Sequence, residues 1–405
     1  MQDVIVVGAG MVGSALALSL AKGGLTVCLV DASAGTPCWQ TSMIDQRVSA
    51  ITQASRYFLE HLGVWPSICT RRVSAYKAMT VWDGEGSGEV TFDAEDAASE
   101  SLGHIVENSA ITDALHEALD AHPGVTCDWQ FSASGYSLTG EGVRLYCDDG
   151  RTHEARLLVG ADGARSNIRH FAGIRTRDRD TGQRGVVTTV THALPHQRTA
   201  RQIFLPGGPL AFLPLMPDER ELTSSIVWSS EAPLAESRMA LSDEAFKAEL
   251  ADAFEYRLGS ITSVAPRVAF PLIQRHAERY TSERVALVGD AAHSIHPLAG
   301  QGVNLGFLDA ATLSEEVLTS VRRGIAVGNA QALSRYSRRR RGDNAQMLML
   351  MDAFRLGFKS QWAPLQLARN LGLNGVEHAT PLKRFFIRQA FGQRGSVPAS
   401  MTGSV

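Results

Sequence analysis

The sequence predicts an α/β protein with three parts: a Rossmann-like nucleotide-binding domain, a second domain built on a mixed β-sheet, and a helical C-terminal region. Three observations predict this fold. A glycine-rich β–α–β unit opens the chain, strand patterns broken by Pro and Gly fill its middle, and helical patterns follow to the end. The 405 residues are enough for two or three domains, so each part has room for a core.

The first unit is an apolar run over residues 3–7, the hexapeptide GAGMVG, a helical stretch, and a second apolar run ending at Asp31. Gly8 permits the tight turn, Gly10 lets the backbone approach a pyrophosphate, and Gly13 lets the helix pack on the strand. The helix N-terminus offers free N–H groups to the anion. Asp31 is placed to bind a ribose, and an acid there disfavours a 2′-phosphate. The unit predicts a site for FAD or NAD, and the alternative is a structural turn.

Two later strand patterns end in an acidic residue and return to the same predicted sheet. Residues 156–159 run into Gly-Ala-Asp-Gly, and residues 284–288 run into Gly289 and Asp290. The nucleotide-binding domain is therefore expected to be discontinuous, while strand patterns at 208–215, 223–228 and 264–272 belong to the second domain. The expected boundaries are 1–75, 100–174 and 281–325 for the FAD-binding domain, 76–99 and 175–280 for the substrate domain, and 326–405 for the helical region.

The segment GDAAHSIHPLAGQGVNLG, over residues 289–306, is predicted to be a strand end, a loop and a helix start. Asp290 is placed to hold the hydroxyls of a sugar chain. Gly300 and Gly302 leave backbone N–H groups free at the helix start. A helix dipole aimed at an isoalloxazine ring would stabilise the negative charge of a reduced flavin. The alternative is an ordinary glycine-rich loop. The helix that follows is expected to reach about Val321.

Composition excludes several classes of protein. Lys and Arg number 39 against 42 Asp and Glu, a balance unsuited to nucleic-acid binding. The five cysteines form no CxxC pair and no His cluster stands at ligand spacing, which argues against a disulfide framework or a metal site. The opening segment lacks the basic start of a signal peptide, and no stretch approaches ~18 consecutive apolar residues. We therefore expect a cytoplasmic protein without a spanning helix.

Three motifs, in order, resemble those of the class A flavoprotein aromatic hydroxylases: residues 8–13, the segment GADGARSNIR at 160–169, and residues 289–306. Within that class, DQRVSAI at 45–51, LGHIVEN at 102–108 and HPLAGQGVNLGF at 296–307 are similar to the ubiquinone-biosynthesis hydroxylases. Residues 200–202 with 212–215, and 253–254 with 257–259, most resemble the branch that hydroxylates 2-polyprenylphenol at ring carbon 5, also called 6-hydroxylation. The resemblance covers nearly the whole chain.

The resemblance implies an FAD-dependent monooxygenase with NAD(P)H as co-substrate. NAD(P)H reduces FAD, O₂ adds at the flavin C4a, and the hydroperoxide transfers an OH group to the ring of a polyprenylated phenol. The protein must orient the ring and exclude water. Two alternatives are a flavin-dependent reductase or oxidase on the same fold, and a non-catalytic FAD-binding scaffold of a biosynthetic complex.

The resemblance also implies roles for individual residues. Those expected to bind the cofactor are Gly8, Gly10, Gly13 and Asp31 at the ADP half, Arg47 near the pyrophosphate, Asp162 and Arg165 toward FAD and transient NAD(P)H, Asp290 at the ribityl chain, and Gly300, Gln301, Gly302 and Asn304 near the flavin. One departure is Asp31, where many relatives carry Glu. The shorter carboxylate puts that contact in doubt, but not the cofactor.

The residues proposed for catalysis and substrate binding are fewer. His296 and Pro297 are expected at the flavin face, as a base and as part of the ring pocket. For His293 we expect a structural role, with a catalytic base as the alternative. Phe212, Leu213 and Pro214 are candidate substrate-wall residues, with ordinary core packing as the alternative.

The expected partners are a polyprenylated phenol, O₂, and either a second copy of the chain or other ubiquinone-biosynthesis proteins. The basic run at 335–341 is expected to be a solvated or ion-paired helix face, with contact to anionic lipid or to a protein as the alternative. The apolar residues at 347–351 and 385–387 are expected to pack in a core or an oligomer rather than insert into lipid. Peripheral contact with the inner membrane is left open.

Overall fold

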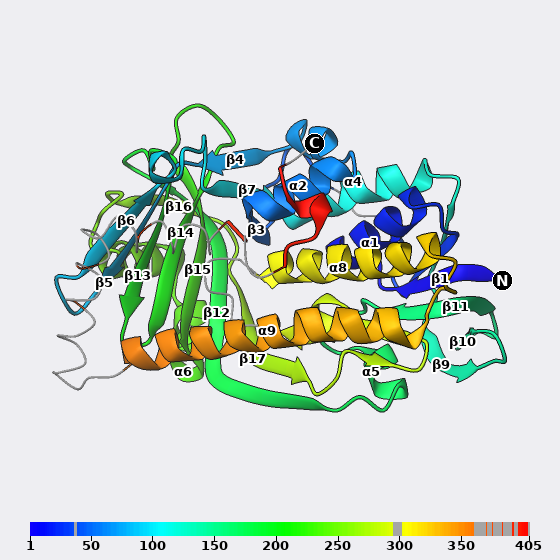
Figure 1. Ribbon diagram of the computed structural model, residues 1–405. Helices are drawn as coiled ribbons and strands as arrows, with labels where there is room; N and C mark the ends of the chain where they lie inside the picture. Colours follow the sequence, from blue (N-terminus) through cyan, green and yellow to red (C-terminus); the bar gives the residue numbers. More distant parts are fainter. Residues whose placement is uncertain are drawn as a thin grey trace.

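The computed structural model describes residues 1–35, 39–294 and 302–359, together with residues 370, 375, 383, 391–392 and 396–403. The side chains of residues 354–359 are not described. Three sheets and the helices that cover them form an α/β fold, with the N-terminal sheet and a larger sheet side by side and two long helices running along them (Figure 1). The predicted fold class is confirmed, while the domain boundaries stay predictions.

The first sheet is a parallel sheet assembled from distant parts of the chain. Its parallel strands, in spatial order, are β8 (Val125–Trp129), β2 (Val27–Asp31), β1 (Gln2–Val7), β11 (Thr152–Gly160) and β19 (Val285–Leu287), and antiparallel additions are β9 (Ala133–Leu138), β10 (Val143–Cys147) and β18 (Thr281–Ser282). All five parallel strands deliver their carboxyl ends to one edge of the sheet, which is the edge where ligands bind in such folds.

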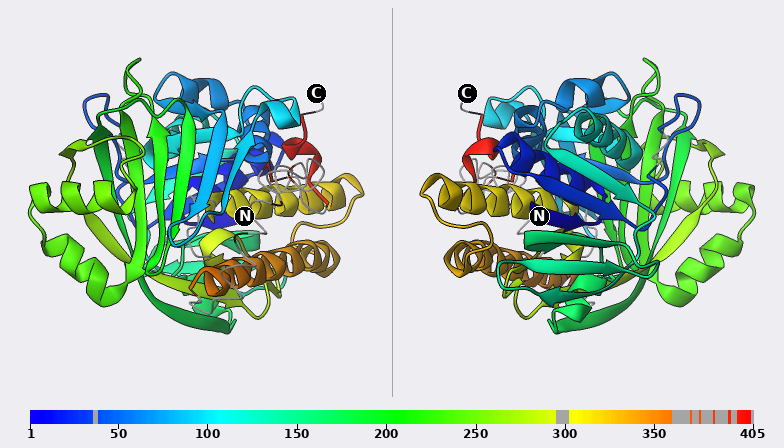
Figure 2. Two further views of the ribbon diagram at one scale, coloured as in Figure 1. Left: turned by 90° about the vertical axis from the view of Figure 1, so that its left-hand side faces the viewer. Right: turned by 90° about the vertical axis from the view of Figure 1, so that its right-hand side faces the viewer.

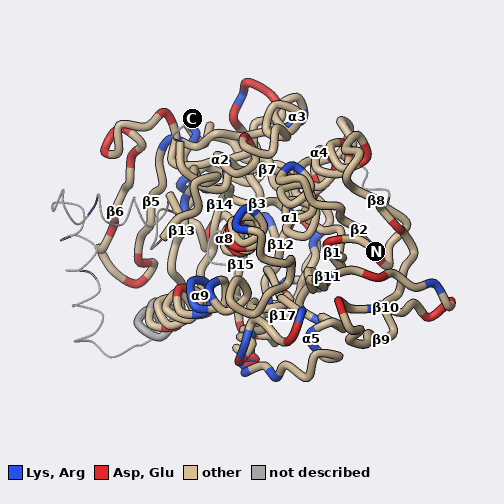
Figure 3. The backbone as a smooth tube through the Cα atoms, turned by 45° about the vertical axis from the view of Figure 1, so that its right-hand side comes forward, with Lys and Arg blue, Asp and Glu red and all other residues tan. Residues whose placement is uncertain are grey.

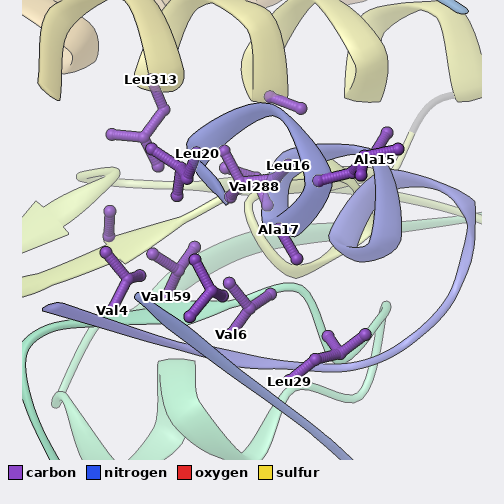
Figure 4. Close-up of a cluster of buried hydrophobic side chains, with 14 of the residues drawn as sticks. Val4, Val6, Ala15, Leu16, Ala17, Leu20, Leu29, Val159, Val288 and Leu313 are labelled. Carbon is purple, nitrogen blue, oxygen red and sulfur yellow. The ribbon is translucent and has the colours of Figure 1, made fainter. Parts of the chain in front are cut away.

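Helices bury this sheet. Helix α1 (Met11–Lys22) packs between α4 (Asn108–Asp120) and α8 (Gly302–Arg322). Side chains of β1, such as Val4 and Val6, meet Leu16 and Leu20 of α1 and Leu313 of α8 in one apolar cluster (Figure 4). The helix predicted to begin near Gly302 and reach about Val321 is confirmed as α8.

The second sheet is mostly antiparallel. Its strands come from chain segments that alternate, along the sequence, with the segments that form the first sheet. Its order is β20 (His293–Ser294), β17 (Val268–Ala277), β12 (Thr176–His192), β15 (Thr223–Glu231), β14 (Gly208–Leu215), β13 (Thr199–Leu205), β5 (Ala78–Asp83) and β6 (Glu89–Asp93), with β16 (Ile261–Val264) also paired to β12. Helices α6 (Ala232–Ala240) and α7 (Asp243–Ala253) cover its outer face (Figure 2). The single strand predicted over 264–272 is wrong: Pro266, which lacks an N–H group, lies between β16 and β17.

A small third sheet, β3 (Val48–Ile51), β7 (Gly103–Glu107) and β4 (Val73–Tyr76), packs against the inner face of the second. The other helices are α2 (Gln53–His61), α3 (Trp65–Cys69), α5 (Asn167–Phe171) and α9 (Ala330–Lys359), and short 3₁₀ turns cover 95–97, 289–291 and 399–401. Helix α9 runs alongside α8 (Figure 2). None of the helices within the described residues is long and apolar enough to cross a bilayer.

Two buried histidines make the fold sensitive to acid. Burial, with smaller contributions from nearby cationic groups, lowers the pKa of His104 and of His192 to about 4. In the unfolded chain a histidine titrates near ~6.5, so between these values the unfolded state binds protons that the folded state does not. The free energy of unfolding should therefore fall as pH decreases from about 6.5 to about 4, by up to about 1.4 kcal/mol per pH unit for each histidine.

The measurement is the free energy of unfolding in urea, at saturating FAD, at several pH values across this range. The same measurement on the His104→Gln variant gives the comparison. The free energy of unfolding of the variant should depend less steeply on pH than that of the parent protein. Equal stability of the parent at the two ends of the window would contradict it.

Candidate cofactor and active site

The glycine-rich loop between β1 and α1 is held by very close backbone contacts. A Cβ atom at Gly8, whose φ is +108°, would lie 2.4 Å from the carbonyl oxygen of Ala161, and a Cβ atom at Gly13 would lie 1.9 Å from that of Gly8. A Cβ atom at Gly10 would meet nothing within 4 Å. The packing roles predicted for Gly8 and Gly13 are confirmed, and the open space beside Gly10 fits the approach of a pyrophosphate.

Asp31 closes the same loop from the end of β2. One carboxylate oxygen accepts the backbone N–H of Ala9 at 2.6 Å, and the other accepts that of Ser33 at 2.7 Å. The carbonyl of Ala9 in turn accepts the Ser14 hydroxyl and the ring N–H of His116. The short Asp31 side chain thus fixes the loop itself, and its predicted contact with a ribose stays a proposal.

The second motif lies beside the first because Ala161 follows β11. Asp162 accepts the Ser166 hydroxyl and, at 3.1 Å, the backbone N–H of Ile168, so its carboxylate caps α5. Arg165 is exposed. Arg169 donates to the carbonyl of Ala291, 2.8 Å away, which ties this motif to the third. The predicted dual contact of Asp162 and Arg165 with FAD and NAD(P)H therefore remains a proposal, and Asp162 already has a structural function.

Asp290 follows β19 at the carboxyl edge of the first sheet. Its side chain is exposed, and no group within the described residues donates a hydrogen bond to its carboxylate. The surrounding protein reduces the hydration of this carboxylate, which raises its pKa, while the nearby charges of His293 and Arg47 lower it. An acceptor with free lone pairs at this edge fits the hydroxyls of a flavin side chain. The guanidinium of Arg47 is exposed and close enough for its charge to act on Asp290. The predicted contact of Arg47 with a pyrophosphate stays a proposal.

A buried carboxylate holds the loop that carries Asp290. Asp309 of α8 is wholly buried and accepts hydrogen bonds from His293 at 2.5 Å, from the backbone N–H of Gly289 at 3.0 Å, and from Arg340 of α9 at 2.7 Å. Asn344 of α9 donates to it at 3.2 Å. Burial alone would raise the pKa of Asp309, but the charges of His293 and Arg340 hold it well below its usual range.

The structural role expected for His293 is supported, because its ring is 2% exposed and bound to Asp309. Sequence reasoning missed Asp309, Arg340 and Asn344. The signal for Asp309 was an acid on the apolar face of an amphipathic helix, since such a position needs a partner elsewhere in the chain.

Two of the substrate-wall expectations need correction. Phe212 is not a substrate-wall residue: its ring stacks on Phe254, 3.7 Å between centroids, on the face of the sheet that α7 covers. Pro214 shares that face because side chains alternate along a strand, whereas Leu213 faces the small third sheet. The amide group of Asn304 donates to the Ala50 carbonyl and accepts the Thr52 N–H, so it helps to position β3, and its predicted place near the flavin stays a proposal.

The remaining predicted residues fall in two groups. The expectations for His296, Pro297, Gly300 and Gln301 lie outside the described residues, as do those for residues 385–387. Gly302 is the first residue of α8.

The basic run on α9, coloured blue in Figure 3, is largely ion-paired. Arg335 and Arg339 bind Glu316 of α8, and Arg340 binds Asp309. Its expected role as an ion-paired face is supported.

Comparisons with known proteins identify the family to which the chain belongs. The family model described as FAD binding domain matches residues 1–350. Ubiquinone hydroxylase UbiL of Rhodospirillum rubrum is 39% identical over 390 residues, covering 96% of this chain and 89% of the relative. The 3-demethoxyubiquinol 3-hydroxylase of Escherichia coli is 38% identical over 390 residues, covering 96% of this chain and 98% of the relative.

Among solved structures, p-nitrophenol 4-monooxygenase PnpA of Pseudomonas putida superposes with a TM-score of 0.77 at 19% identity, over 98% of this chain and 99% of that one. At that identity the likeness shows a shared fold.

The assignment of Asp290 predicts a loss of cofactor affinity on substitution. Asp290→Ala removes an acceptor of charge-assisted hydrogen bonds, which are worth about 1.5 to 3 kcal/mol each. The Kd for FAD, measured by quenching of flavin fluorescence, should therefore rise roughly 10- to 100-fold. Asp252→Ala, an exposed substitution on α7, serves as the matched control. An Asp290→Ala protein that retains the parent's affinity would remove Asp290 from the site.

Proposed function

The chain belongs to the FAD binding domain family and, within it, to the hydroxylases of ubiquinone biosynthesis, and from this premise we propose that it hydroxylates the aromatic ring of a polyprenylated phenol. It is an FAD-dependent monooxygenase, with NAD(P)H as the co-substrate typical of the class. Bound FAD supplies the redox chemistry: it accepts a hydride from NAD(P)H and activates O₂. The chain has to bind the flavin, orient the ring beside it and keep water away.

The observation that carries the proposal is the meeting of three loops at one sheet edge. The loop after β1 touches the loop after β11 through Gly8 and Ala161, and Arg169 connects that loop to Ala291 in the loop after β19. Each of these loops contains one of the flavin motifs. Their convergence supports a bound dinucleotide at this edge. Gln46, the neighbour of Arg47, donates to the Pro266 carbonyl in the β16–β17 connection, so the segment around Arg47 is tied to the second sheet.

The identity of the ring is the finer part of the proposal. The Escherichia coli relative is named for 3-demethoxyubiquinol and the Rhodospirillum rubrum relative for ubiquinone hydroxylation. Both names describe a ring of the ubiquinone pathway. Resemblance at 200–202 and 212–215 favours 2-polyprenylphenol for this chain. Comparing turnover of 2-polyprenylphenol with that of a demethoxyubiquinol tests the choice.

The partners follow from the same substrate class. A polyprenyl tail resides in a bilayer, so the enzyme has to collect its substrate at a membrane surface or from another protein. Arg335, Arg339 and Arg340 are used in ion pairs within the chain, which leaves the exposed Arg338 and Arg341 for such a contact. Association with other biosynthetic proteins, or with a second copy of the chain, stays a prediction.

The proposal predicts that productive oxygen transfer depends on the tail. Each buried CH₂ group is worth about 0.8 kcal/mol, so one prenyl unit should raise kcat/KM by well over an order of magnitude if its binding energy seats the ring. A loosely held tail-free phenol should instead consume NAD(P)H and release H₂O₂.

The measurement is hydroxylated product per NAD(P)H consumed, for phenols of increasing tail length, with ¹⁸O₂ to identify the source of the new oxygen. Equal coupling for phenol and its prenylated analogue would reject the lipophilic substrate. Unlabelled product, or NAD(P)H consumption without any hydroxylated ring, would favour a reductase or oxidase, and a protein inert toward NAD(P)H would favour a scaffold.

A further inference from the structure

The segment that carries Arg47 has no regular secondary structure, so it depends on side chains for its shape. Residues 39–47 lead into β3 without forming a helix or a strand. The backbone carbonyls of such a segment have no ladder partners, and each needs a donor from elsewhere in the chain. Arg72, just before β4, supplies three of these donors. Its guanidinium donates to the carbonyls of Gln40 at 3.1 Å, Thr41 at 2.7 Å and Met43.

Arg72 is in turn fixed by a buried carboxylate, that of Glu107 at the end of β7. Glu107 is 2% exposed, and its two oxygens accept hydrogen bonds from Arg72 at 2.6 and 3.1 Å. The same oxygens accept the ring N–H of Trp39 at 3.4 Å and the backbone N–H of Asp45 at 2.6 Å. The Arg72 guanidinium also lies over the Trp39 ring, 5.2 Å from its centroid. A buried carboxylate has to be paired and hydrogen-bonded, so Glu107 holds the segment both at Trp39 and at Asp45.

Asp45 connects this segment to the start of helix α4. One of its carboxylate oxygens accepts the backbone N–H of Arg47 at 2.9 Å, and the other accepts that of Ser109, in the first turn of α4, at 3.1 Å. A carboxylate is stabilised at a helix N-terminus by the free N–H groups and the helix dipole. The carbonyl of Arg47 accepts the backbone N–H of Asn108, the first residue of α4, at 2.9 Å. The backbone of Arg47 is therefore tied to α4 through both its N–H and its carbonyl.

Helix α4 also contacts the glycine-rich loop. His116, in the second half of the helix, is buried, and its ring N–H donates to the carbonyl of Ala9 across 2.8 Å. Ala9 immediately precedes Gly10, where the backbone is expected to meet a pyrophosphate. One helix thus sets the position of the Arg47 backbone relative to that loop, while the Arg47 guanidinium stays exposed near Asp290.

We propose that Glu107 and Arg72 are positioning residues of the cofactor site, which fix residues 39–47 so that the Arg47 guanidinium meets the pyrophosphate of FAD. Neither residue belongs to the three flavin motifs, and both act through Arg47 rather than on the cofactor. A cation whose backbone is already in place loses less conformational freedom when its ligand binds, and this pre-organisation raises affinity. The inference rests on the proposed function, including the contact of Arg47 with the pyrophosphate, and deepens it by naming the residues that hold this cation.

The experiment measures the Kd of the full chain for FAD, by quenching of flavin fluorescence, in a double-mutant cycle of Glu107→Gln and Arg47→Met. The first change keeps the shape of the side chain but removes its charge, and the second removes the cation. Glu117→Gln is the matched control, an ion-paired carboxylate on α4 whose partners are Arg71 and Ser67. Asp45→Asn, at a half-buried position, goes through the same cycle, so the inference stays testable if Glu107→Gln fails to fold. Tm and near-UV circular dichroism are recorded for every variant.

Arg47→Met alone should raise the Kd for FAD about 10-fold or more, because charge-assisted hydrogen bonds to the pyrophosphate are lost. Glu107→Gln should raise the Kd about 5- to 10-fold when Arg47 is present, but less than about twofold in the Arg47→Met protein, because its effect acts through Arg47. Asp45→Asn should show the same dependence on Arg47, and Glu117→Gln should leave the Kd unchanged. A general loss of stability would instead weaken FAD binding by the same factor with and without Arg47.

Equal factors for Glu107→Gln with and without Arg47 would overturn the inference. Folded Glu107→Gln and Asp45→Asn proteins that bind FAD as tightly as the parent would also overturn it, as would an unchanged Kd for Arg47→Met. Each of these results leaves the proposed function intact if the parent hydroxylates a prenylated phenol. Failure of the parent to hydroxylate any prenylated ring would instead contradict the proposed function.

Discussion

One buried carboxylate, that of Asp309, connects the parts of the chain that have to meet for a cofactor to bind. A charge without solvent is strongly unfavourable unless it is paired and fully hydrogen-bonded. Asp309 meets that requirement only when Arg340 of α9, His293 and the backbone of Gly289 are all in place. Helix α8, helix α9 and the loop that carries Asp290 are thus held in one arrangement. Tyr336 of α9 adds a hydrogen bond to the carbonyl of Leu287 at the end of β19.

Much of the fold could be predicted because its signals are local. The apolar run, the glycine spacing and the terminal Asp31 lie within one β–α–β unit, and the contacts of Gly8 and Gly13 follow from that spacing. The helix that begins at Gly302 was predictable from its amphipathic pattern. The partners of Asp309 were not, because Arg340 and Asn344 lie on another helix and nothing near Asp309 in the sequence identifies them.

The second sheet shows where sequence patterns lead to error. All four residues from Phe212 to Leu215 are apolar, so no alternation of polar and apolar residues shows which side chains share a face. The structure assigns Phe212 to the helix-covered face and Leu213 to the face that packs against the small third sheet. Which face each side chain takes depends on long-range strand pairing, which a single sequence does not specify.

The most direct test of the role of Asp309 is the FAD affinity of Arg340→Met, because Arg340 belongs to α9 and carries none of the flavin motifs. Arg338→Met, an exposed change two residues away, is the control, and Arg340→Lys tests rescue by a retained charge. Kd is measured by flavin titration well below the melting temperature of each variant, with near-UV circular dichroism to verify folding. The account predicts at least a tenfold weaker Kd for Arg340→Met, partial recovery in Arg340→Lys and no change in Arg338→Met. A folded Arg340→Met protein that binds FAD as tightly as the parent would contradict it.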